Sequence, residues 1–247
     1  MAESKIEWTE QTWNPTTGCT KVSPGCKHCY AEKMAGRLKA MGASGYEAGF
    51  ELALHPARLS HPMKRKMATV WFVNSMSDLF HEEIPDSFLD RVFETIRATP
   101  HHTFQILTKR AERLPDYFSR RECPGNVWLG VSVEDRHYGV PRIDALRNVN
   151  ARVRFLSVEP LLENLGPIDF TGIQWVIVGG ESGPKARPMR PEWVDAIRRQ
   201  CAAQGAAFFF KQWGGWGADG VKRNKKANGR LLHGRTWDEL PVHSAIR

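Results

Sequence analysis

The sequence predicts an α/β fold: a partial or complete parallel (β/α) barrel formed by a single domain. Two observations predict it. Short β-branched and aromatic runs alternate with helical stretches, and a cysteine-rich loop follows a further short strand near the N-terminus. Continuous apolar strands separated by helices are typical of a parallel sheet that helices cover. A doubly wound sheet is the alternative, because periodicity does not show whether a sheet closes.

The N-terminal part holds the first expected strand and helix. Residues Ile6 to Thr17 are rich in tryptophan and threonine and are expected to contain a short strand. From Cys29 to Met41 apolar side chains recur at helical spacing, and Gly42 follows as a stop signal. The cysteine loop therefore lies between a strand and a helix.

The rest of the chain is regular. We expect strands at Thr69–Asn74, Thr103–Leu107, Val127–Val133, Val153–Val158, Gln174–Val178 and Ala206–Phe210. We expect helices near Pro85–Ala98, Arg110–Phe118, Val140–Arg147 and Pro191–Gln204.

Length and composition fit a globular protein. The chain has 247 residues, of which 41% are hydrophobic and 25% are charged. Lys and Arg number 35 against 27 Asp and Glu, and the resulting net charge of +8 favours a polyanionic partner such as nucleic acid without requiring one. The sequence has no signal-peptide pattern and no apolar run of membrane-spanning length, so we expect a cytoplasmic protein with no membrane partner.

Three of the five cysteines lie close together, as Cys19, Cys26 and Cys29 with the spacing C-x6-C-x2-C. Clustered thiolates usually share zinc or the iron of an iron–sulfur cluster. In a [4Fe–4S] cluster, three cysteines leave one iron open for another ligand. In a zinc site His28 would be the candidate fourth ligand. The separate Cys123 and Cys201 are expected to be buried, inert thiols.

A polar or charged residue follows each regular strand directly. The ionisable residues just past these strand ends are Asp78, Lys109, Glu134, Glu159, Glu181 and Lys211. The carboxyl ends of parallel strands meet at one edge, where α/β active sites are built. Solvation of strand ends explains any single case, but six in succession with both signs favour a catalytic rim facing the cysteine loop.

The composition changes after Gln212. Trp213-Gly214-Gly215-Trp216-Gly217 precedes the basic run Lys222-Arg223-Asn224-Lys225-Lys226. Basic residues interleaved with tryptophan suit single-stranded nucleic acid, because cations follow phosphates while rings stack on bases. A solvated tail is the alternative. We therefore divide the chain into a barrel, residues 1–213, and a C-terminal extension, residues 214–247.

Motifs along nearly the whole chain resemble the three-cysteine, radical-SAM-like proteins of phages and bacteria, a family without a settled reaction. The matching motifs are Trp13-Asn14-Pro15, Gly18-Cys19 through Cys29-Tyr30-Ala31, Ser77-Asp78-Leu79-Phe80, Leu107-Thr108-Lys109-Arg110, Gly130-Val131-Ser132-Val133-Glu134, Ser157-Val158-Glu159-Pro160-Leu161-Leu162, Gly179-Gly180-Glu181-Ser182-Gly183 and Phe210-Lys211-Gln212-Trp213-Gly214.

The wider resemblance is to radical SAM enzymes, which hold a [4Fe–4S] cluster on three cysteines in a partial barrel. It implies that Cys19, Cys26 and Cys29 are the cluster ligands and that S-adenosylmethionine (SAM) binds the open iron. That superfamily has Gly-Gly-Glu after its second strand, where this chain has Asn74-Ser75-Met76-Ser77-Asp78. The residues expected to contact the cofactor are His28, Tyr30, Ser77, Asp78, Ser132 and Glu134.

The leading hypothesis is therefore a radical-SAM-type enzyme that modifies or repairs a nucleic acid or nucleotide. In it Asp78, Glu134 and Glu159 hold polar groups of SAM or substrate, while Lys109 and Lys211 counter negative charge. One alternative is a nucleic-acid-binding protein stabilised by zinc. The other is an iron–sulfur protein that serves redox or sensing functions without SAM.

Overall fold

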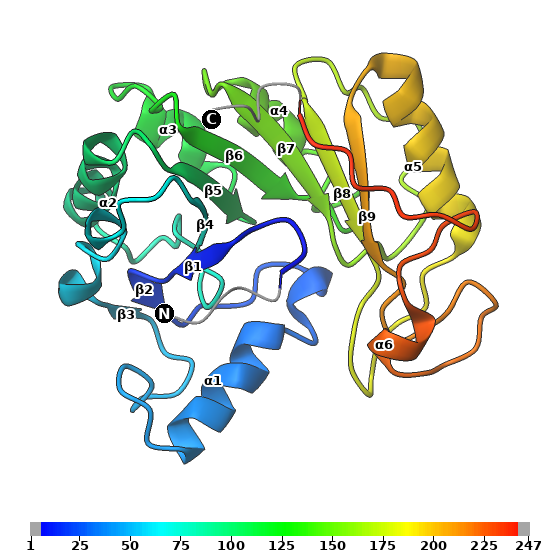
Figure 1. Ribbon diagram of the computed structural model, residues 1–247, viewed down its shortest axis with the longest axis horizontal. Coiled ribbons are helices and arrows are strands. Elements are labelled where there is room, and N and C mark those ends of the chain that lie inside the picture. The colour runs from blue at the N-terminus through cyan, green and yellow to red at the C-terminus, as the bar shows by residue number, and fades with distance from the viewer. Residues whose placement is uncertain (1–5, 242–247) are drawn as a thin grey trace.

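The computed structural model describes residues 6–241, and its centre is a curled sheet of seven parallel strands (Figure 1). The order across the sheet is β1-β4-β5-β6-β7-β8-β9. The strands are β1 (Gln11–Trp13), β4 (Val70–Val73), β5 (Thr103–Thr108), β6 (Val127–Ser132), β7 (Val153–Val158), β8 (Trp175–Gly179) and β9 (Ala207–Gln212). Two short strands, β2 (Thr16–Thr17) and β3 (Ala53–Leu54), form a separate antiparallel pair.

Helices connect most of the parallel strands. They are α1 (Tyr30–Ala40), α2 (Asp86–Ala98), α3 (Arg113–Phe118), α4 (Arg142–Arg147), α5 (Pro191–Gln204) and α6 (Lys225–Asn228), with short 3-10 helices η1 (Pro24–Cys26), η2 (Pro56–Arg58) and η3 (Pro62–Lys64). Figure 1 shows α2 to α5 along the outer side of the curved sheet, whereas α1 and α6 lie away from that layer. An ordered loop, residues 159–174, joins β7 to β8 instead of a helix.

Strand alternation gives the sheet two different faces, because successive side chains point to opposite sides. The outer face packs Val73, Ile106, Leu129 and other aliphatic residues against the helices in the main hydrophobic core. The inner face carries a second, largely aromatic core, whose members are Trp8, Phe72, Trp128, Val153, Phe155, Trp175, Ile177 and Phe209. These rings fill the inside of the curl, so the concave side is packed below the rim.

Trp8 fills part of this interior although it precedes the first strand. Its ring lies edge-on to Phe72 at a centroid distance of 4.8 Å and to Trp175 at 6.0 Å. Its carbonyl oxygen accepts a hydrogen bond from Gln105 Nε2 at 3.2 Å. The N-terminal segment therefore closes the inside of the barrel from below.

The sheet remains open, because β1 and β9 stand at opposite ends of the strand order. The edge of β9 is covered by the C-terminal extension: Phe210 N donates to Trp237 O at 2.9 Å, and Phe209 bridges to Asp238 in antiparallel fashion. The predicted α/β fold is thus confirmed as a partial parallel (β/α) barrel, and each predicted strand and helix is present within a few residues of its expected bounds.

No helix among residues 6–241 combines the length and the apolar character needed to cross a membrane.

Candidate metal and cofactor site

The cysteine loop, residues 18–29, lies between β2 and α1 at the carboxyl edge of the sheet. Gly18 N donates to Met76 O at 3.0 Å, and Cys19 N donates to Phe50 O at 3.2 Å. Gly18 has a φ of +81°, and a Cβ there would lie 2.0 Å from Glu51 O, so only glycine fits this position. Helix α1 begins at Tyr30, directly after Cys29. The loop is therefore fixed at both ends.

The three cysteines of this loop are partly buried, and Cys26 lies within electrostatic range of Cys19. Burial, with a contribution from Asp78, raises the pKa of Cys19 to about 11, Arg110 opposes that rise, and Cys26 adds to it. The pKa of Lys21 is raised, chiefly by its hydrogen bond to Glu32, and Cys29 and Cys26 both add to the rise. As they stand within residues 6–241, no three Cys, His, Asp or Glu side chains lie close enough to hold a metal ion.

The chemistry of the donor set suits an iron–sulfur cluster with one open iron. Three thiols on one loop supply the three ligands that leave one cluster iron open, whereas structural zinc requires four. His28, the expected fourth zinc ligand, lies within electrostatic range of Glu181, whose pKa it helps to lower.

The two isolated cysteines, Cys123 and Cys201, are buried as predicted, and burial raises both thiol pKa values to about 12.

Arg110 contacts the loop directly, a role that the sequence did not reveal. Its Nη1 donates to Cys19 Sγ at 3.3 Å, and its Nη2 donates to Thr20 O at 3.1 Å and to Thr20 Oγ1 at 2.6 Å. Its Nε donates to Glu82 Oε2 at 2.6 Å. The sequence signals were its place beside Lys109, just after β5, and its presence in the motif Leu107-Thr108-Lys109-Arg110.

Asp78 is buried and holds protein groups. Its Oδ1 accepts from Thr108 Oγ1 at 2.7 Å and from Phe80 N at 3.0 Å, and its Oδ2 accepts from Lys109 N at 2.9 Å. Arg110 Nη1 lies 3.5 Å from Oδ2. This carboxylate therefore joins the loop after β4 to the end of β5 and positions Arg110.

Glu134 lies under the cysteine loop, and its side chain is fully buried. It accepts from Arg142 Nη1 at 2.7 Å and from Ser23 Oγ, and a Cβ on Gly25 would lie 3.0 Å from its Oε1. Burial acts to raise the pKa of Glu134, but Lys109, Arg142 and the two hydrogen bonds outweigh burial and lower it. Glu134 is therefore a buried carboxylate held in its charged form.

Ser132 and Lys109 lie beside this carboxylate. Lys109 Nζ donates to Ser132 Oγ at 3.1 Å, and Arg142 Nη1 donates to Ser132 O at 2.8 Å. The ends of β5 and β6 thus share one polar cluster.

Glu181 reaches the cysteine loop through Arg187. Arg187 Nη2 donates to Glu181 Oε1 at 2.6 Å and to Pro24 O at 3.0 Å, while its Nε donates to Glu181 Oε2 at 3.0 Å. Burial opposes the net lowering of the pKa of Glu181, which comes from these bonds and the charge of Arg187. No sequence motif pointed to Arg187.

Glu159 and Lys211 pair with each other. Lys211 Nζ lies 2.8 Å from Glu159 Oε2, and Gln212 Nε2 donates to Glu159 Oε1 at 3.3 Å. Their side chains are 15% (Lys211) and 21% (Glu159) exposed. The pair joins the ends of β7 and β9 and presents both charges beside solvent.

The other two predicted cofactor residues differ in setting. Ser77 Oγ donates to Thr16 O at 2.9 Å and lies 2.8 Å from Thr16 Oγ1, so it ties the loop after β4 to β2. Tyr30 is 65% exposed at the start of α1.

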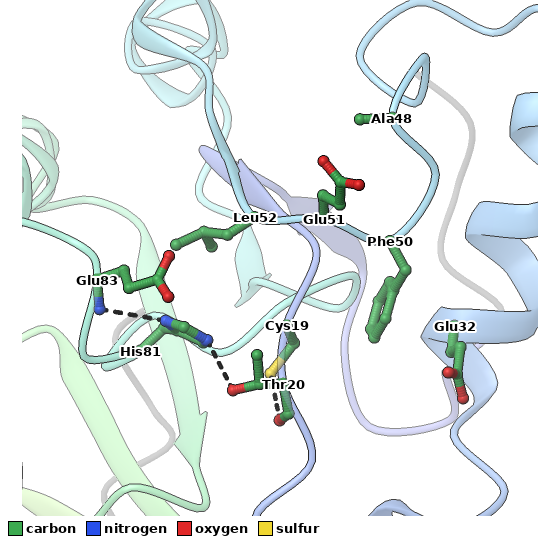
Figure 2. Close-up of a pocket in the computed structure, with 9 residues that line it drawn as sticks. All are labelled: Cys19, Thr20, Glu32, Ala48, Phe50, Glu51, Leu52, His81 and Glu83. Carbon is green, nitrogen blue, oxygen red and sulfur yellow. Dashed lines mark hydrogen bonds between the residues drawn. The ribbon is translucent and has the colours of Figure 1, made fainter.

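A pocket of about 580 Å³ opens beside Cys19. Figure 2 shows its lining, which is Cys19, Thr20, Glu32, Ala48, Phe50, Glu51, Leu52, His81 and Glu83. His81 Nδ1 accepts from Glu83 N at 3.2 Å, so its Nε2 donates to Thr20 Oγ1 at 2.9 Å. Burial, aided by Arg110, lowers the pKa of His81. The sequence singled out neither His81 nor the three lining glutamates.

A second pocket, of about 300 Å³, lies where the C-terminal extension meets the end of β9, and it is mostly basic. Its lining is Glu7, Lys211, Gln212, Lys225, Lys226, Gly229 and Arg230. Nearby, Lys222 Nζ lies 5.6 Å from the centre of the Trp216 ring. The extension packs on the barrel through Trp237, whose ring meets Phe208 edge-on at 5.8 Å.

The chain was compared with known protein families and with curated proteins. A family model described as "Protein of unknown function (DUF5131)" matches residues 3–241, so the chain belongs to that family. Comparison with curated proteins finds no match.

Solved structures of spore photoproduct lyase resemble the chain in fold. A tyrosine-to-phenylalanine mutant matches with a TM-score of 0.52 and 13% identity, over 86% of this chain and 78% of that one. The complex with dinucleoside spore photoproduct matches with a TM-score of 0.48 and 14% identity over 81% of this chain, which spans 62% of that protein. A mutant with bound AdoMet and the same dinucleoside matches with a TM-score of 0.45 and 15% identity over 72% of this chain, which spans 57% of that protein.

Proposed function

We propose that this member of the DUF5131 family is an iron–sulfur enzyme of the radical SAM type that acts on a nucleic acid or nucleotide. The observation that supports it most is the cysteine loop at the carboxyl edge of a partial barrel, tied to three strand ends by Arg110, Glu134 and Arg187. A loop fixed in this way suits a bound cofactor, because its backbone is held before the cofactor arrives.

Cys19, Cys26 and Cys29 would hold the cluster. Bound there with SAM, the cluster supplies reductive cleavage of SAM, as in the superfamily that the motifs resemble. The chain itself positions the loop. Asp78 and Glu134 hold Arg110 and Ser23 in place, and Glu181 holds Arg187. Glu159 and Lys211 are more accessible, and we assign them to substrate or SAM polar groups.

The pocket beside Cys19 is the candidate entry to this site. Its three glutamates and Phe50 offer negative charge and an aromatic face, features that suit a cationic group joined to a flat ring. Tyr30 and His28 flank Cys29 in the sequence, and we assign them their predicted roles as cofactor contacts.

SAM cleavage tests the proposed function. The full chain, reconstituted anaerobically and given dithionite, is expected to form 5′-deoxyadenosine from SAM, and the Cys26→Ala variant is expected to form none. A cluster-loaded wild-type protein that yields no 5′-deoxyadenosine would contradict the SAM assignment and leave the redox alternative.

The nucleic-acid part of the proposal is supported by the basic pocket and the interleaved tryptophans of the extension. Lys226 lines the basic pocket together with Lys211, and Lys222 lies beside the ring of Trp216. Cations beside a ring suit phosphates followed by stacked bases.

Charge reversal in the extension tests this part. Changing Lys222, Arg223, Lys225 and Lys226 to glutamate is expected to weaken single-stranded DNA or RNA binding roughly tenfold or more and to flatten its salt dependence. The control reverses four exposed basic residues that precede the strands, namely Lys64, Lys66, Arg120 and Arg152. Equal losses from both sets would show that net charge alone drives binding.

A further inference from the structure

We propose that Arg110 is a positioning residue for the iron–sulfur cluster, raising the cluster's reduction potential through an N–H···S hydrogen bond to Cys19. This inference rests on the cluster of the proposed function. Arg110 is 6% exposed, and the guanidinium nitrogen Nη1 lies 3.3 Å from Cys19 Sγ.

The guanidinium is fixed by contacts on all of its nitrogens. Nη2 donates twice to Thr20, and Nε donates to Glu82 at 2.6 Å. The backbone N of Arg110 donates to Thr108 Oγ1 at 2.9 Å, which anchors the residue to the end of β5. A planar group held by so many bonds presents one N–H to the sulfur in a single orientation.

Arg110 also lies close to a buried negative charge. The same Nη1 that contacts Cys19 lies 3.5 Å from Asp78 Oδ2, and Asp78 is 6% exposed. Without the guanidinium, this buried carboxylate would act on the cluster unopposed. Arg110 therefore both donates a hydrogen bond and offsets Asp78.

Both effects act in one direction on reduction. Taking up one electron makes a cluster more negative, so a donor to a ligand sulfur and a nearby cation stabilise the reduced form. The low dielectric of a buried site strengthens these effects. Removing Arg110 is expected to make the cluster harder to reduce while the three cysteine ligands stay in place.

The test compares Arg110→Met with wild type in the full chain, reconstituted anaerobically. Iron and sulfide per chain are measured first, and the reduced fraction is then followed by electron paramagnetic resonance at fixed potentials. At one fixed potential the ratio of reduced to oxidised cluster is expected to fall roughly tenfold, the size of one charge-assisted hydrogen bond. A merely structural role would lower iron content and leave that ratio unchanged.

The control is Arg113→Met. Arg113 lies three residues further along the chain and pairs with Asp86 at 2.6 Å. The substitution therefore removes a cation close in sequence to Arg110 without removing a contact to a cysteine. Its ratio is expected to match wild type, and a fall equal to that of Arg110→Met would overturn the hydrogen-bond account.

Arg110→Lys covers the case in which Arg110→Met does not fold. It keeps a cation beside Asp78, but a lysine cannot bridge Thr20 and Cys19 together, so a smaller fall in the ratio is expected. A wild-type ratio in the folded Arg110 variants, with full iron, overturns this inference alone. A wild-type protein that holds no cluster overturns the proposed function and this inference together.

Discussion

Replacing Cys26 with alanine is expected to abolish iron binding by the reconstituted protein. Cys26 is one of three partly buried thiols on the loop between β2 and α1, and two thiolates are too few to hold a four-iron cluster. The measurement is iron and acid-labile sulfide per chain after anaerobic reconstitution, with the folded state checked by circular dichroism.

Cys123→Ala is the matched control. Cys123 is 9% exposed, in the hydrophobic core on the outer side of the sheet. Its substitution is expected to leave the iron content unchanged, at a small cost in stability. If both variants lose iron equally, the assignment of Cys26 as a ligand is wrong.

Replacing Arg142 with methionine is expected to lower the free energy of unfolding by about 3–5 kcal/mol, because it leaves Glu134 charged and buried without its partner. Arg142 is 4% exposed and lies 2.7 Å from Glu134, whose side chain has no exposed surface. Urea denaturation of the metal-free protein measures the loss. Because Glu134 underlies Ser23 and Gly25, the variant is also expected to loosen the cysteine loop.

Arg199→Met provides the comparison. Arg199 is 67% exposed and pairs with Asp195 at 3.4 Å, so its substitution is expected to cost less than about 1 kcal/mol. Similar losses for both variants would show that the Arg142–Glu134 pair contributes no more than a surface pair.

The same pair predicts a dependence of stability on pH. The pKa of Glu134 in the folded protein lies below its ordinary value of 4.5, despite burial, because of Lys109 and Arg142. Its contribution to stability is therefore fully present above about pH 4.5 and is lost as the pH falls through the lower folded value. In the Glu134→Gln variant the free energy of unfolding is expected to fall less steeply as the pH drops below about 4.5. An unchanged pH dependence would show that other carboxylates cause the loss of stability in acid.

The strands and helices could be predicted because each carries its own local pattern. Val153–Val158 reads as a buried strand from its apolar run alone, and the structure gives the same bounds. Pro191 and Gly205 bracket α5, which ends at Gly205 with a φ of 75°. The strand-end charges were also predictable, since parallel strands end at one edge.

The contacts that organise the site were not predictable, because their partners are far apart in sequence. Arg110 and Cys19 are 91 residues apart, and Arg187 and Pro24 are 163 apart. Single-residue patterns show that arginine is present but give no partner for it. Trp8 likewise fills the barrel interior through contacts with distant rings, so its sequence position gives no hint of that role.

The central claim is that the three cysteines hold a cluster with an iron that is open to SAM. The most direct test assays iron, sulfide and zinc in the anaerobically reconstituted full chain and records electron paramagnetic resonance of the reduced sample with and without SAM. About four irons per chain and a signal that SAM perturbs are the predicted result. Stoichiometric zinc with no cluster would contradict it and make the protein a zinc-stabilised binding protein.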